Sequence, residues 1–141
     1  AYKGNVPALN ALITGEVHVV FATAGSGGSF VRSGRVRGVA VTSAKPSPLF
    51  PGIPSIAESG VPGYESVSVI GLLAPARTPR DIVRRLNQEV VRALNRPEVK
   101  ERFMNAGSEV VASTPEEFLG VIRSETARMG KVIRDAGIRD E

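Results

Sequence analysis

The stretch VSVIGLLAPARTPRDIVRRLNQEVVRAL, residues 67–94, decides the fold class. Residues 67–74 are apolar almost without interruption, which predicts a short strand that is buried on both faces. Thr78 and Pro79 then give a capping residue followed by proline, which predicts a helix start. The apolar residues of this helix repeat at helical spacing: Ile82, Val83, Leu86, Val90 and Leu94. A strand that leads into an amphipathic helix is the building unit of an α/β fold.

The same alternation extends to both sides of this stretch. Further strands are predicted at 17–21, 37–42 and 110–111, and further helices at 5–14, 29–33, 97–104 and 115–136. Gly15 should end the first of these helices, while Thr114-Pro115-Glu116-Glu117 forms a capping box at the start of the last. We therefore expect an α/β architecture, a mostly parallel sheet with flanking helices.

Prolines interrupt the pattern in the middle of the chain. Residues 45–55 contain Pro46, Pro48, Pro51 and Pro54, which prevent regular structure and keep the preceding residues extended. This segment is either a rigid surface loop or a crossing between two parts of the protein, and the two readings are compatible. A short helix over 56–59 should follow it and stop at Gly60.

The composition of the 141 residues excludes several kinds of protein. There is no cysteine, so disulfides, thiolate metal sites and cysteine nucleophiles are excluded. A single histidine, His18, cannot build a multi-histidine metal site, and we expect no metal and no cofactor. Charged residues or glycines interrupt every apolar run before it reaches the roughly 20 residues that a membrane helix needs. The chain starts without a methionine or a signal sequence, so we expect it to be part of a longer protein.

The net charge of +4 raises the question of nucleic-acid binding. The later arginines are interleaved with acidic residues, and aromatic residues make up only 5% of the chain. This pattern favours a mildly basic, solvated surface, so we expect no nucleic-acid partner.

Three features could suggest catalysis, and each has a simpler explanation. His18 has no acid or nucleophile beside it, so a structural or surface histidine is favoured. The glycine-rich run 25–29 lacks the Gly-Lys-Ser/Thr ending of a phosphate-binding loop and is expected to be a mobile or tight loop. Helix capping accounts for the Glu116-Glu117 pair. We therefore expect a protein that is not an enzyme; a self-contained small α/β enzyme or sensor domain is the alternative.

The chain around Gly4 is the best candidate for a binding site. A turn through Gly4 into a helix presents backbone N–H groups that have no partner inside the helix, and these groups favour an anion such as a carboxylate. Pro7 has no N–H, so the donors would come from Asn5, Val6, Ala8 or Leu9. The alternative is an ordinary helix start that is capped by the Asn5 side chain.

Several blocks of the sequence resemble one family. They are AYKGNVPA at 1–8, LITGEV at 12–17, SGRVRGVAVTS at 33–43, PSIAESGVPGYE at 54–65, GLLAP at 71–75 and TPEEF at 114–118. Together they resemble the substrate-binding proteins of tripartite tricarboxylate transporters, the Bug-type periplasmic receptors. The resemblance covers nearly the whole chain, with departures at His18, where the family usually has Asp, and at Val69, where it has an aromatic residue.

The resemblance implies an extracytoplasmic, periplasmic solute-binding protein with a type II periplasmic-binding-protein fold, a two-lobed Venus flytrap of about twice this length. It implies that residues 1–42 are the later part of the second lobe, 43–65 a crossing segment and 66–141 the C-terminal half of the first lobe. Its ligand would be a small carboxylate and its partners the membrane subunits of the transporter. The implied ligand-binding residues are Tyr2, Lys3, Gly4, Asn5, Pro7, Ala8, Thr23 and Ala24.

The resemblance also implies that the first-lobe strands next to those predicted at 67–74 and 110–111 are absent from this chain. Unpaired backbone groups and an apolar face recruit other chains, so we also expect self-association.

Overall fold

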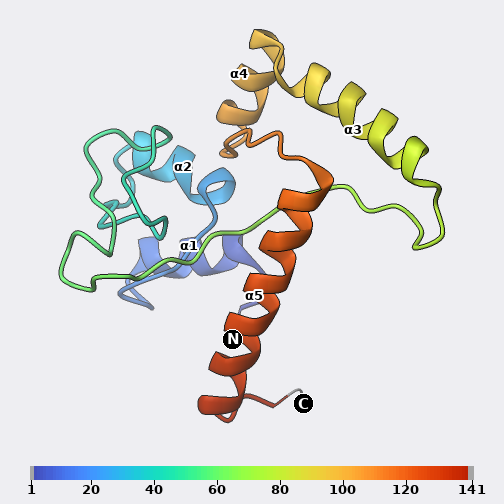
Figure 1. Cartoon of the computed structure of the whole chain (residues 1–141). Coiled ribbons are helices and arrows are strands. Elements are labelled where there is room, and N and C mark those ends of the chain that lie inside the picture. Colours follow the sequence, from blue (N-terminus) through green and yellow to red (C-terminus); the bar gives the residue numbers. More distant parts are fainter. Residues whose placement is uncertain (1, 140–141) are drawn as a thin grey trace. The chain divides into compact units, whose positions relative to one another are not determined.

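The computed structural model of the chain describes residues 2–139. Within them lie five helices, and Figure 1 shows their order. They are α1 (Asn5–Thr14), α2 (Ala24–Arg32), α3 (Arg80–Leu94), α4 (Pro97–Asn105) and α5 (Pro115–Asp135). None of the helices in this described part is long and apolar enough to cross a membrane.

The chain divides into two compact units. The first consists of Ala1–Val69 with Pro97–Val110, and the second of Ile70–Arg96 with Val111–Glu141. The lobe boundaries that the sequence predicts refer to a whole receptor and stay a prediction.

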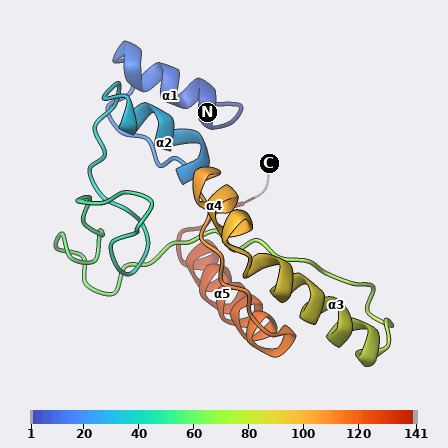
Figure 2. The ribbon, with the colours of Figure 1, turned by 90° about the horizontal axis from the view of Figure 1, so that it is seen from above.

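Helices α1 and α2 pack against each other in the first unit, and Figure 2 shows them side by side. Leu9 and Ala11 of α1 are buried there. The helix ends where the sequence predicts, because Gly15 adopts a left-handed φ of 80° and its N–H donates to the carbonyls of Ala11 and Leu12.

The prediction of a loop at the glycine-rich run is wrong, because residues 25–29 lie inside α2. Glycine disfavours a helix, but here the backbone of another segment lies close against it. A Cβ atom on Gly25 would lie 2.7 Å from the carbonyl oxygen of Ala106, and one on Gly107 would lie 2.3 Å from the Gly25 nitrogen. The turn after α4 therefore packs directly on the first turn of α2, and only glycine allows this approach.

The prediction of a mostly parallel sheet is not met in residues 2–139. One isolated parallel bridge joins Val41 and Ser55, and the segments 17–21, 67–74 and 110–111 run without ladder partners. The physical reason is that a strand exists only through hydrogen bonds to a neighbour. The predicted helix at 56–59 is also wrong, since these residues form hydrogen-bonded turns in which Ile56 accepts from Ser59 and Val61.

In the second unit, α3 contacts α5, and a hydrogen-bonded corner leads into α5. The Asn87 side chain donates to the carbonyl of Ser113 at 2.9 Å. Next along the chain, Thr114 and Glu117 form the predicted capping box, in which the Glu117 carboxylate accepts from the Thr114 backbone N–H at 2.8 Å. This hydrogen bond lowers the pKa of Glu117. The start of α5 is thus fixed by local contacts.

Candidate functional site

Helix α1 begins without a side-chain cap. Gly4 is its N-cap residue, with φ 105° and ψ 178°, and Asn5 is the first helical residue. The alternative in which Asn5 caps the helix is therefore wrong. Backbone N–H groups at the start of α1 are left for another acceptor.

The Asn5 side chain instead joins the start of α1 to the start of α2. Its Nδ2 donates to Oγ1 of Thr23 at 3.2 Å, and Thr23 is the N-cap residue of α2. The Thr23 and Ser26 hydroxyl oxygens lie 2.8 Å apart, and the Ser26 hydroxyl donates to the Thr23 carbonyl at 3.1 Å. Each hydroxyl has one proton to donate, which sets the direction of these hydrogen bonds. Asn5 donates to Thr23, Thr23 donates to Ser26, and Ser26 donates to the backbone carbonyl of Thr23.

These bonds bring together two helix starts that both favour an anion. No side-chain hydrogen bond caps α2 either, and the first turns of α1 and α2 contain no acidic residue. By contrast, α3 has Asp81 in its first turn, and α5 has Glu116 and Glu117. The positive ends of α1 and α2 are thus not neutralised by their own sequences, so an external carboxylate would be stabilised there.

The structure brings only some of the implied ligand-binding residues close together. Gly4, Asn5, Thr23 and Ala24 meet at the joined starts of α1 and α2, which we call the paired helix starts. Pro7 and Ala8 complete the first turn of α1, while Lys3 is exposed just before Gly4.

Tyr2 is the implied residue whose polar group is engaged elsewhere. Its hydroxyl donates to the Glu16 carboxylate at 2.7 Å, and this bond raises the pKa of Tyr2. Tyr2 therefore belongs to the flank of α1 rather than to the paired helix starts.

Ser26 is the residue that the sequence reasoning missed. Its spacing of three residues from Thr23 is typical of a helix start, but the glycines around it indicated a loop. His18 is exposed. Among residues 2–139 no group of three or more His, Asp or Glu side chains is arranged to hold a metal ion.

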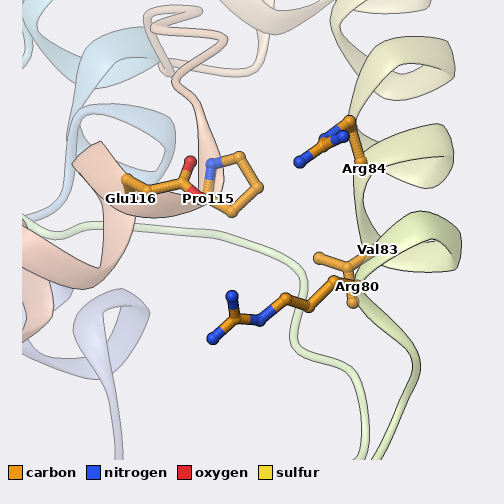
Figure 3. Close-up of a pocket in the computed structure, with 5 residues that line it drawn as sticks. All are labelled: Arg80, Val83, Arg84, Pro115 and Glu116. Atoms are coloured by element: carbon orange, nitrogen blue, oxygen red, sulfur yellow. The ribbon is translucent and has the colours of Figure 1, made fainter.

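A separate pocket of about 460 Å³ lies in the second unit. It is lined by Arg80, Val83 and Arg84 of α3 and by Pro115 and Glu116 of α5. Figure 3 shows the two arginine side chains extending from α3 on the side of Pro115 and Glu116. The pocket contains none of the implied ligand residues, and its lining combines both signs of charge.

Comparison with known proteins decides the family. Residues 1–138 match the pattern that defines the tripartite tricarboxylate transporter family receptors. The chain belongs to this receptor family. The resemblance found in the sequence is thereby confirmed. The family is one of binding receptors, which confirms the expectation of a non-enzyme at the level of the family and disfavours the self-contained enzyme.

Three relatives illustrate the similarity. A protein encoded in the clcB-clcD intergenic region of Pseudomonas knackmussii is 38% identical over 134 residues, which cover 94% of this chain and 79% of the relative. A protein from the tcbD-tcbE intergenic region of Pseudomonas sp. strain P51 is 36% identical over 94% of this chain and 40% of its own length. BugT of Bordetella pertussis is 32% identical over 98% of this chain and 42% of BugT.

Two solved structures carry the same fold in part of their chains. The R. palustris protein Rpa4515, solved with adipate, matches with a TM-score of 0.81 and 35% identity, over 96% of this chain and 46% of that one. The periplasmic binding protein BugD matches with a TM-score of 0.75 and 29% identity, over 99% of this chain and 48% of that one. The chain thus carries part of the periplasmic-binding-protein fold and spans less than half of either structure.

Proposed function

We propose that this receptor chain binds a small carboxylate at the paired helix starts and serves solute uptake of the tripartite tricarboxylate type. The observation that carries the proposal is the Asn5–Thr23 hydrogen bond, because it joins two helix starts that have neither a side-chain cap nor an acidic residue. A relative solved with adipate supports a carboxylate as the ligand class.

The chemistry of binding follows from the backbone. A carboxylate has two oxygens that can accept several N–H groups, and each helix start offers such groups together with a partial positive charge. Gly4 has no Cβ atom, and nothing lies within 4 Å of the position that a Cβ atom would take, so a ligand can approach the backbone closely at the start of α1. Asn5 and Thr23 act as positioning residues, since their bond holds the two sets of donors together.

The wider architecture belongs to the same proposal. A periplasmic receptor with two lobes would hold its ligand between them, and the membrane subunits of the transporter would receive it. In that receptor, residues 1–42 would form the later part of the second lobe, 43–65 the crossing segment and 66–141 the C-terminal half of the first lobe. The similarity to BugD supports the periplasmic location.

The test follows backbone amides by NMR during titration with adipate. We expect the amide signals of Asn5, Val6 and Ala24 to shift on addition of adipate. The uncharged 1,6-hexanediol, which has the same chain length, should not shift them.

A matched pair of variants tests whether charge at the helix starts matters. Asn5→Asp places a negative charge in the first turn of α1 and removes the donor to Thr23, so it should abolish the shifts. Asn10→Asp makes the same change at an exposed position of the same helix and should leave them intact. Equal responses of the two variants, or shifts confined to other residues, would refute a carboxylate site at the paired helix starts.

A further inference from the structure

The positive charge of the chain is concentrated on α3 and its two ends. Residues 77–96 contain six arginines and only two acidic residues, so this stretch carries +4, which is also the formal net charge of the whole chain. All six arginines are exposed: Arg77, Arg80, Arg84, Arg85, Arg92 and Arg96. Over the rest of the chain the two signs of charge balance, so this helix is the one strongly charged element in the sequence.

Most of these arginines have no partner in the protein. Arg92 forms an ion pair of 3.0 Å with Glu89. Within the described residues 2–139, the other five arginines form neither an ion pair nor a side-chain hydrogen bond. Their guanidinium donors are therefore available to an acceptor from outside the chain.

The arginines within α3 lie on the side of the helix away from its apolar residues. At about 100° per residue, an arc of about 140° contains four of them, which we call the arginine face: Arg80, Arg84, Arg85 and Arg92. Asp81 lies within this arc, whereas the apolar positions at 82, 86 and 90 lie outside it. Any element that covers the apolar side of α3 would thus leave the arginine face at the surface.

A recess lies at one end of the arginine face. Arg80 and Arg84 are one helical turn apart, and both line the pocket of about 460 Å³ together with the apolar groups of Val83 and Pro115. Their side chains extend from α3 on the side of Pro115, as Figure 3 shows. Glu116 also lines the pocket, but it does not pair with either arginine. Since a guanidinium group can bind a carboxylate through two parallel hydrogen bonds, an acidic side chain fits this recess.

We propose that the arginine face docks an acidic segment of a partner protein, with one carboxylate held between Arg80 and Arg84. Charge complementarity selects such a segment and steers its approach. Nucleic acid fits less well, because residues 77–96 contain no aromatic side chain on which a base could stack. A lipid surface also fits less well, because a flat layer of headgroups does not fill a recess. The arginine face shares no residue with the paired helix starts, so this inference does not depend on the ligand proposed there.

The test titrates the 141-residue chain into fluorescent hexaglutamate with blocked termini, and fluorescence anisotropy measures binding. The solution contains salt at about 0.15 M and no adipate. We expect saturable binding of hexaglutamate and no binding of hexaglutamine. Unlabelled N-acetylglutamate amide carries one carboxylate only, so it should compete at least about tenfold more weakly per carboxylate than unlabelled hexaglutamate.

Two double variants locate the contact. Arg80→Gln with Arg84→Gln removes both guanidinium groups of the recess and should weaken binding of hexaglutamate at least about tenfold. Arg123→Gln with Arg134→Gln removes the same charge from exposed positions of α5 and should weaken binding less than about twofold. Circular dichroism verifies that both variants keep their helices.

Four results would overturn the proposal. Absence of hexaglutamate binding would remove the docking surface, and equal weakening in the two double variants would show attraction to the net charge alone. Equal competition by N-acetylglutamate amide would make the recess a site for small anions. Tighter binding to phosphatidylglycerol vesicles or to oligothymidine than to hexaglutamate would assign the arginine face to a membrane or a nucleic acid. Because adipate is absent, none of these results bears on the carboxylate site.

Discussion

Gly107 to alanine is the most informative single substitution in the first unit. Gly107 has a φ of 80°, and an added Cβ atom would lie 2.3 Å from the Gly25 nitrogen and 2.6 Å from the carbonyl carbon of Ala24. Two costs therefore combine. A left-handed conformation costs an alanine about 1–2 kcal/mol, and the overlap with the first turn of α2 costs about 1–3 kcal/mol more.

Gly15 provides a control with the same backbone conformation. Its φ is also 80°, but nothing lies within 4 Å of the position of its Cβ atom. Gly15→Ala should therefore lose only the conformational part, about 1–2 kcal/mol of unfolding free energy. Gly107→Ala should lose about 2–5 kcal/mol, the sum of both parts.

Urea unfolding followed by far-ultraviolet circular dichroism measures both losses. A displaced first turn of α2 should also weaken the adipate response in Gly107→Ala but not in Gly15→Ala. Equal losses of stability in the two variants would refute the close packing of the turn after α4 on α2.

Three predictions concern the corner that leads into α5. Thr114→Ala removes the hydroxyl that accepts from the Glu117 backbone N–H, one half of the capping box, and should cost about 1 kcal/mol in urea unfolding. The pKa of Glu117 is lowered in the folded chain, chiefly by the backbone N–H of Thr114, so the stabilisation by its carboxylate is present above the unfolded value of 4.5 and should fade as the pH falls through the lower folded value. An acid titration should show this loss in the parent and not in Glu117→Gln, which has no carboxyl to titrate. Ala112 has a left-handed φ of 53°, so Ala112→Gly should relieve strain and raise the unfolding free energy by about 0.5 kcal/mol. A loss of stability in Ala112→Gly would contradict this reading of its backbone.

The helices that sequence reasoning predicted well are those whose ends are set locally. Gly15 ends α1 through its own conformation, and the Thr114–Glu117 box starts α5. Both signals lie within a few residues of the ends that they determine, so the sequence pattern suffices.

The start of α2 could not be predicted in the same way. Its glycines favour a loop when they are considered alone, and the contact that holds them in a helix comes from Gly107, about eighty residues further along the chain. Ser26 was missed for the same reason, because its hydroxyl has a role only once residues 23–26 form a helix start. The prediction of strands was not met for a related reason. Residues 67–74 have the pattern of a buried strand, but a strand needs a partner segment, which a local pattern does not contain.

The distribution of acids among the helices connects stability with binding. Where a helix only needs to be stable, this chain places acids in the first turn, as Asp81 does in α3 and Glu117 in α5. The first turns of α1 and α2 contain no acidic residue, although one there would stabilise an exposed helix by about 0.3–1 kcal/mol. Neither helix start has a side-chain cap, and the Asn5 amide forms a hydrogen bond that joins the two starts. A bound carboxylate would supply negative charge and acceptors at both helix starts, so the absence of caps and acids there and the proposed affinity would have one physical origin.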